Sequence, residues 1–319
     1  MSGTAPKPAY NSARRIKWLA FAVLLVIALY SGGWYFAADR IGGFVDERID
    51  TLAAEGVKID CPDREVRGFP FRIGLFCSDL DVDAPTEAFA LDAGAFRSAA
   101  QVYDPTRAVI EVDAPVAINV AGEAVRLNYA VGQAVVAVRA PGRRSLSIEL
   151  QDGVGAASDV TAEWERLTAF SREAENNLEL AIQAVGLTTD AADLPVLNID
   201  AYALIAEASY ETTSLRGKTG MLRRFAVRLT DDRGLLANGP FSVSEVGLVD
   251  ADISVRVIDV PGIVSELEVI SPALSAAIGG FLQLQPLGGD NGDEVAFDIS
   301  VRDGQASIGF IPLGAIPRL

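Results

Sequence analysis

The longest apolar run of the chain lies near its N-terminus, where no charged residue occurs from Trp18 to Ala38. A helix of about 20 such residues is long enough to cross a hydrocarbon core of about 30 Å. Trp18 lies at one end of the run and Trp34 near the other, as aromatic rings do at the two membrane interfaces. The pattern predicts a transmembrane anchor over residues 18–38.

The charges around this run predict its orientation. The basic residues of the region all precede the run: Lys7, Arg14, Arg15 and Lys17. By the positive-inside rule, residues 1–17 are cytoplasmic and residues 39–319 lie across the membrane. A cleaved signal peptide is the alternative, because Ser31-Gly32-Gly33 offers small residues for cleavage, although the apolar run exceeds the usual core of about 7–15 residues. Both interpretations export the body of the protein.

Helical spacing continues directly after the run. The apolar residues of this stretch recur three or four positions apart: Ile41, Phe44, Val45, Ile49 and Leu52. Gly56 follows where helices commonly end. We therefore expect a helix that continues the anchor and packs against the rest of the domain.

From residue 77 onward, apolar and polar positions alternate in short segments, with turn residues roughly every 8–12 positions. Segments 106–122 and 123–142 are examples. No strand–helix–strand rhythm accompanies them, so a parallel sheet is not expected. The predicted fold is mostly β with a few helices: an N-terminal transmembrane helix followed by one elongated, antiparallel, β-rich exported domain over residues 39–319.

Three further segments are predicted to be helical: residues 214–225, 261–269 and 272–284. The last follows Ser271-Pro272, a favourable N-cap followed by proline at the first helical position. Segment 159–176 is ambiguous, because Val160, Trp164 and Leu167 also suit a helix. We expect two short strands there.

Composition and charge narrow the classes of partner. Half of the residues are apolar, and the mean hydropathy is +0.26. The whole chain carries −16 and residues 1–38 carry +4, so residues 39–319 carry −20. A body this acidic repels phosphate backbones, and we expect no nucleic-acid partner.

The chain contains no histidine. This excludes Ser-His and Cys-His nucleophile pairs, histidine metal sites and the commonest general base. We expect no catalytic residues, no metal and no cofactor, and we interpret the protein as a non-enzyme. A hydrolase that uses carboxylates is the remaining enzymatic alternative.

Two motifs imitate ligand-binding loops. Gly153-x-Gly155 resembles a dinucleotide loop, but Ser158 replaces its third glycine, so a hairpin or bulge is favoured. Asp79, Asp81 and Asp83 have calcium-loop spacing, but alanines stand at the positions that require Gly and Glu. We interpret these aspartates as a solvated strand face, and the acidic segment 290–294 as a turn.

The only two cysteines, Cys61 and Cys77, lie at equal distances on either side of Phe69. In an exported protein they allow one intramolecular disulfide. A hairpin turn centred on Phe69 would pair Glu65 with Ile73 and Cys61 with Cys77. Directly opposed strand residues are about 4.5–5.5 Å apart, within disulfide range. The spacing therefore predicts a structural disulfide.

Between the cysteines stands the motif Gly68-Phe69-Pro70-Phe71-Arg72, and the chain ends in DISVRDGQASIGFIPLGAIPRL. Together these features resemble a membrane-anchored alphaproteobacterial family catalogued as a domain of unknown function, DUF2125. The resemblance implies a single-pass inner-membrane protein whose body faces the periplasm. A weaker likeness, in pattern only, is to AsmA-like envelope proteins, whose β-rich grooves handle lipid.

Arg72 is the polar residue of this motif that has two distinct interpretations. It forms a salt bridge across the hairpin with Glu65 or Asp63, or it docks the hairpin against the membrane-proximal helix or a lipid phosphate.

These observations favour an envelope protein that binds or passes a lipid or other amphiphile along an apolar sheet face. The alternative is a structural or assembly adaptor for other envelope proteins, with its apolar face internal and no ligand. The expected partners are the membrane, a phospholipid or other amphiphile, and other envelope proteins.

Overall fold

The computed structural model describes residues 12–140, 142–190, 195–212, 214–230, 232–270, 275 and 294–319. The predicted helix at 272–284 and the predicted acidic turn at 290–294 lie outside the described residues, apart from Ser275 and Glu294.

One continuous helix, α1 (Ser12–Ala54), contains both the predicted anchor and the helix expected after it. The most apolar part of the segment Arg14–Ala54 has a mean hydropathy of 1.9, and the segment is long and apolar enough to cross a membrane. Gly56 follows the helix with φ +95°, a conformation that favours glycine. The predicted helix after the apolar run is therefore confirmed, and it is fused to the anchor.

The rest of the described chain is almost entirely strand, which confirms the predicted fold class. The elements are β1 (Lys58–Asp60), β2 (Glu65–Arg67), β3 (Arg72–Cys77), β4 (Leu80–Ala84), η1 (Pro85–Glu87), β5 (Phe89–Ala93), β6 (Phe96–Gln101), β7 (Asp104–Val112), β8 (Val116–Val120), β9 (Glu123–Val138), β10 (Arg144–Ala157), β11 (Val160–Ala174), β12 (Asn177–Thr189), β13 (Leu197–Ala206), β14 (Thr219–Thr230), β15 (Arg233–Val243), β16 (Val249–Ile258), α2 (Val260–Ile270), β17 (Glu294–Arg302), β18 (Gln305–Ile308) and β19 (Ile311–Ala315).

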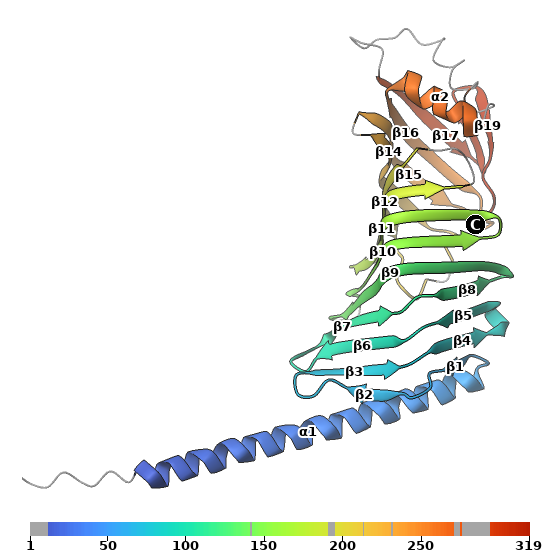
Figure 1. Ribbon diagram of the computed structural model, residues 1–319. Coiled ribbons are helices and arrows are strands. Elements are labelled where there is room, and N and C mark those ends of the chain that lie inside the picture. Colours follow the sequence, from blue (N-terminus) through green and yellow to red (C-terminus); the bar gives the residue numbers. More distant parts are fainter. Residues whose placement is uncertain are drawn as a thin grey trace, which may run out of the picture.

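These strands form one antiparallel sheet with meander connections. The first eight strands form two series of four short strands, in the pairing orders β2–β3–β6–β7 and β1–β4–β5–β8. The last strand of each series pairs with the long strand β9. From β9 to β19 each strand pairs with the next. The sheet therefore rises from α1 at one end to α2 near the other (Figure 1).

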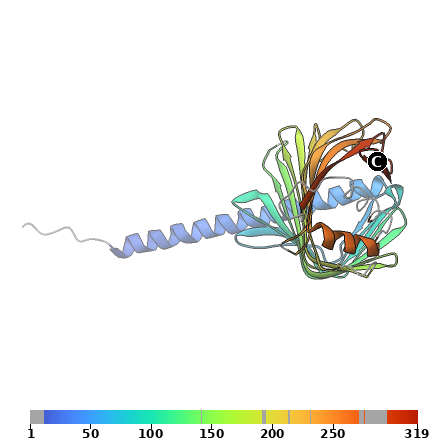
Figure 2. The ribbon, with the colours of Figure 1, turned by 90° about the horizontal axis from the view of Figure 1, so that it is seen from above.

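Viewed along this stack, the sheet is curled, and α2 lies on the inside of the curl (Figure 2). The apolar side of α2 contributes Val260 and Ile263 to a buried cluster with Val255, Val257 and Phe297 of the sheet. We call the face on which α2 packs the inner face. The opposite face is the outer face.

The structure confirms the predicted helix at 261–269, which is α2. Segment 159–176 is strand, as expected, but it forms the single 15-residue strand β11 and not two short strands. The predicted helix at 214–225 is wrong, because this segment leads into strand β14. A bulge between Leu222 and Phe225 lets these apolar residues, three positions apart in sequence, lie on the same face of one strand. That spacing imitates a helix.

The predicted register of the first hairpin is also wrong. Glu65 pairs with Phe76, not with Ile73, so the register is shifted by three residues. The turn is wider than expected because its residues make other contacts. Phe69 packs on the aromatic rings of α1, and the carbonyl of Phe71 accepts a hydrogen bond from the amide of Val102, 3.0 Å away.

Candidate functional site

The inner face carries an uninterrupted row of apolar side chains. Directly opposed residues of neighbouring strands point to the same face of a sheet, so the register extends the inner face outward from α2. From β17 to β7 the opposed residues are Phe297, Val255, Ala237, Phe225, Ala201, Ile182, Ala169, Ile148, Ala134 and Ile110. We call these ten residues the central inner row.

Large and small side chains alternate along this row. Alanine occupies it on β9, β11, β13 and β15, between larger residues on the strands at either side. Side chains crowd one another on the concave face of a curled sheet, and a small residue on every second strand relieves this crowding. The alternation therefore suits the curl seen in Figure 2.

The exposure of the row changes along its length. Under α2, Val255 is 4% exposed and Phe297 8%. In the middle of the sheet, Ile148 is 37% exposed and Ile182 51%. One end of the apolar row is therefore closed by α2, while its middle is open to solvent.

A second apolar row runs beside the first. We call it the flanking inner row: Val295, Val257, Leu235, Val227, Ile199, Ala184, Leu167, Leu150 and Gly132. The two rows together make an apolar stripe that crosses nine strands. The inside of the curled sheet therefore offers one continuous apolar surface.

The outer face is different. There the opposed residues include a row of polar side chains: Asp200, Gln183, Thr168, Glu149, Gln133, Glu111 and Arg97. Members of this row bond within the face, as in the hydrogen bond from Gln133 Nε2 to Glu111 Oε1 at 3.5 Å. The middle of the sheet is thus amphipathic, with its apolar stripe inside and polar side chains outside.

A buried carboxylate stands at the end of the inner face. The Glu173 side chain is 2% exposed and accepts hydrogen bonds from Arg144 Nε and Nη2 at 2.8 and 2.7 Å. It also accepts one from the Tyr210 amide at 2.9 Å. The guanidinium and the amide stabilise the charged form and lower the pKa of Glu173 to about 2. This pair fastens the segment after β13 to β10 and β11.

The other carboxyl groups with shifted pKa values in the described chain are also shifted downward. Hydrogen bonds to their charged forms are the cause: from Arg97 to Asp113, from the Thr161 amide to Asp190, from Arg302 to Asp252 and from Arg233 to Asp259. A general acid needs a pKa raised toward neutrality. These carboxylates therefore serve as ion-pair and hydrogen-bond partners.

The residues of the two motifs that imitate ligand-binding loops lie mostly within strands. Gly153 and Gly155 lie within β10, where a Cβ on Gly153 would stand 2.4 Å from Trp164 Cζ2, so these glycines make room for the indole. Asp81 and Asp83 are strand residues of β4. Among the described residues, no group of acidic or cysteine side chains has a geometry suited to a metal ion.

The motif at residues 68–72 docks the first hairpin onto α1. The Phe69 ring stacks on Tyr35 at 5.7 Å and meets Trp34 edge-on at 5.5 Å. Trp34 Nε1 donates to the carbonyl of Arg72 at 2.9 Å, and Tyr30 Oη donates to the carbonyl of Pro70 at 2.5 Å. The main chain of Arg72 thus makes the contact that one interpretation assigned to its side chain.

The two acids proposed as partners for Arg72 bond elsewhere: Glu65 pairs with Arg67 at 2.6 Å, and Asp63 accepts from Ser78 at 3.5 Å. The Arg72 side chain is exposed. The salt-bridge interpretation across the hairpin is therefore wrong.

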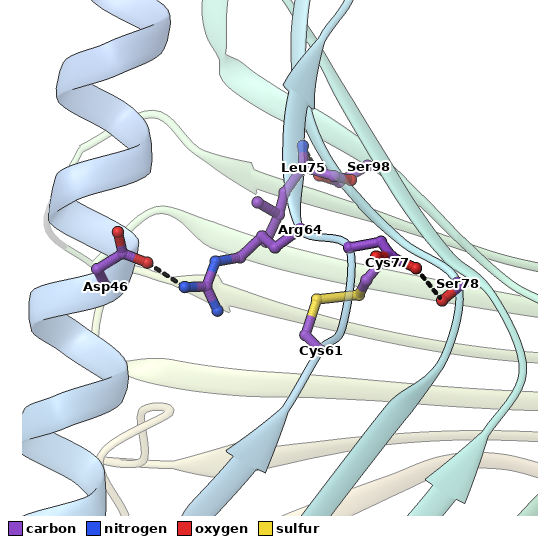
Figure 3. Close-up of a disulfide and its surroundings, with 8 residues drawn as sticks. Asp46, Cys61, Arg64, Leu75, Cys77, Ser78 and Ser98 are labelled. Atoms are coloured by element: carbon purple, nitrogen blue, oxygen red, sulfur yellow. Dashed lines mark hydrogen bonds and ion pairs between the residues drawn. A yellow bond between two sulfur atoms is a disulfide. The ribbon is translucent and has the colours of Figure 1, made fainter.

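The two cysteines are joined in a disulfide with a Cα–Cα distance of 5.5 Å (Figure 3). It links the connection between β1 and β2 to the end of β3. Close by, Arg64 forms an ion pair with Asp46 of α1. The disulfide holds the first strands of the sheet together, and the ion pair holds them against the helix.

Sequence reasoning located the motif, the cysteines and the anchor, but it missed the central inner row. Its ten members come from ten strands and become neighbours only through the register. No local pattern in the sequence marks them as a set.

The fold therefore defines a class of protein in which a long apolar helix carries a curled antiparallel sheet with an apolar inner face. The chain belongs to a bacterial family described as uncharacterized, DUF2125, whose family model matches residues 34–317. No curated protein and no solved structure matches the chain.

Proposed function

We propose that this chain is a non-enzymatic, inner-membrane-anchored periplasmic protein of the cell envelope. Its curled sheet binds or passes the acyl chains of a phospholipid or similar amphiphile along the inner face. The observation that carries this proposal is the central inner row, which is apolar on ten successive strands and half exposed at Ile182.

The energetics of the inner face support an acyl ligand. Each CH₂ group transferred from water to an apolar surface gains about 0.8 kcal/mol. A chain laid along several strands therefore gains a large favourable free energy without a specific polar contact. Contiguous exposed apolar surface of this kind commonly marks a ligand or membrane site.

The anchor and the disulfide support the proposed location. The basic residues before the apolar run favour a cytoplasmic N-terminus, and a disulfide is stable in the oxidising periplasm. In this orientation the sheet edge that carries the β2–β3 and β6–β7 turns faces the membrane, because the N-terminal part of α1 projects beyond that edge (Figure 1). The strands of the inner face then run roughly along the helix axis, with one end directed toward the source of lipid.

The assembly adaptor is the second candidate. An adaptor without ligand needs a closed core, in which the inner face is covered by protein. The exposure of Ile148 and Ile182 favours the open, lipid-binding alternative.

The proposal is tested by photo-crosslinking in cells that produce the full chain. The photoreactive residue p-benzoyl-phenylalanine replaces Ile182 on the inner face or its neighbour Gln183 on the outer face, both exposed in β12. We expect lipid adducts by intact mass at position 182 and at least fivefold fewer at 183. Equal, background-level labelling at both positions would contradict lipid binding and favour the adaptor.

A further inference from the structure

We propose that the tips of two hairpins form a second membrane contact beside α1. The residues are Phe69 and Phe71 in the β2–β3 turn, and Val102 and Tyr103 in the β6–β7 turn; we call them the aromatic tip. The occupant of this surface is the lipid bilayer that α1 crosses. The inference rests on the anchor that forms part of the proposed function, but not on lipid binding by the inner face.

The contacts with α1 fix the depth of the tip. Tyr30 and Trp34 lie within the uncharged run that ends at Ala38, and they bond to the carbonyls of Pro70 and Arg72. With a rise of 1.5 Å per helical residue, Tyr30 lies about 12 Å inside the end of the run. A turn that is hydrogen-bonded to Tyr30 shares this depth. It therefore reaches below the membrane surface if the run spans the bilayer.

The second turn lies beside the first. The amide of Val102 donates to the carbonyl of Phe71 at 3.0 Å, which joins the two tips. Figure 1 shows both turns at the same edge of the sheet, the edge beyond which the N-terminal part of α1 projects. The two hairpins therefore meet the bilayer together.

The side chains of the tip suit lipid better than water. Phe71 is 67% exposed and Tyr103 77%, while Phe69 and Val102 are 46% and 40% exposed. Residues 68–71 and 102–103 carry no charge in a chain that is strongly acidic overall. Tyr rings are favoured at the membrane interface, and Phe rings are apolar, so this uncharged turn can insert with little desolvation cost.

Cations follow directly behind the tip. Arg72 and Arg107 are exposed and line a pocket of about 590 Å³ that also contains Arg97, Asp104 and Glu111. Arg97 is neutralised by Asp113 and Glu111, and Asp104 accepts from Thr106 Oγ1 at 2.6 Å. The guanidinium groups of Arg72 and Arg107 stand where headgroup phosphates would lie above an inserted tip.

A two-point contact would fix the rotation of the sheet about α1. A single helix leaves the attached domain free to turn about the helix axis. With the tip inserted, the first strands of the sheet keep one orientation toward the membrane.

The test uses the full chain reconstituted into vesicles of phosphatidylethanolamine and phosphatidylglycerol. p-Benzoyl-phenylalanine replaces Phe71 or Tyr103 at the tip, Phe21 in α1, or Phe310. Phe310 is an 87% exposed phenylalanine in the β18–β19 turn and serves as the matched control. After illumination, we expect lipid adducts at 71 and 103 to approach the level at 21 and to exceed the level at 310 at least fivefold. Labelling at 71 and 103 no higher than at 310 would overturn the inference.

Position 182 in the same vesicles separates this inference from the proposed function. Adducts at 71 and 103 without adducts at 182 would support the aromatic tip and contradict lipid binding by the inner face. Adducts at 182 without adducts at 71 and 103 would do the reverse. An absence of adducts at Phe21 would remove the anchor and overturn the inference with it. Each variant is verified as folded by an intact mass two hydrogens below that of the reduced chain and by an unchanged β-sheet circular dichroism spectrum.

Discussion

The indole Nε1 of Trp34 donates a hydrogen bond to the carbonyl oxygen of Arg72, 2.9 Å away. This bond connects the apolar helix to the first hairpin of the sheet across 38 residues of sequence. Because the hairpin motif begins the meander, the helix and the sheet are positioned as one structure. The position of the sheet relative to the membrane then follows from the position of Trp34 in the helix.

Replacing Trp34 with Phe is predicted to loosen this junction. The variant keeps an aromatic ring but leaves the Arg72 carbonyl without its donor, which costs about 1 kcal/mol. Hydrogen exchange in residues 68–76 should accelerate, while exchange in β12 and β13 stays unchanged. Trp18→Phe is the matched control, because Trp18 is 64% exposed and lies outside the junction. Equal exchange in the two variants would show that the bond does not hold the hairpin.

Removing the disulfide is predicted to destabilise the first strands of the sheet, β1 to β3. Cys61 and Cys77 are 16 positions apart, and closure of a loop of this size contributes about 3 kcal/mol in the chain-entropy model. The double variant Cys61→Ala/Cys77→Ala should therefore melt several degrees below the wild type. A reductant should lower the melting temperature of the wild type but not that of the variant. A wild-type mass without the loss of two hydrogens would contradict the disulfide itself.

Acid is predicted to release the segment after β13. The pKa of Glu173 is lowered from 4.5 to about 2 in the folded protein, so its stabilising effect is complete above about pH 4.5. It is lost as the pH falls from 4.5 toward 2. Glu173→Gln should cost about 2–3 kcal/mol at pH 7, because Arg144 loses its buried partner. The variant should also show a weaker decline in stability over that acidic range.

Glu211 provides the control for this prediction. It contacts the same Arg144 at 3.2 Å, but its side chain is 82% exposed. Exposed ion pairs contribute about 0–1 kcal/mol, so Glu211→Gln should leave both the stability and the acid profile nearly unchanged. Equal effects of the two substitutions would contradict the special role of the buried carboxylate.

Local patterns in the sequence predicted the elements better than their arrangement. The uncharged run and the residue alternation are local, so the helix and the antiparallel strands could be predicted. Leu222 and Phe225 misled the prediction, because a bulge gives a strand the spacing of a helix. The same spacing separates Trp164 from Leu167, with the exposed residues Glu165 and Arg166 between them, and made β11 ambiguous.

The candidate site depends on the pairing register of neighbouring strands, which cannot be read from local sequence patterns. The symmetric placement of the cysteines around Phe69 suggested direct pairing, but the packing of Phe69 on α1 widens the turn and shifts the register. The central inner row depends on nine such registers. The place of Ala169 in the apolar row is recognised only from its pairing with Ile148 and Ile182, which come from the strands on either side.

Two neighbouring substitutions test whether the apolar inner face holds an acyl chain. Ile182→Glu places a charge in the middle of the central inner row. Gln183→Glu adds a carboxylate one residue away, on the outer face. Both positions are exposed, so neither change is expected to unfold the sheet.

The measurement is native mass spectrometry of the full chain, purified in a mild detergent, with lipid extraction from the same samples. We predict that the wild type and Gln183→Glu retain phospholipid in a fixed ratio, and that Ile182→Glu loses at least one bound lipid. Lipid that associates only with α1 would remain in all three proteins. A lipid content that is identical in the three folded proteins would contradict the claim.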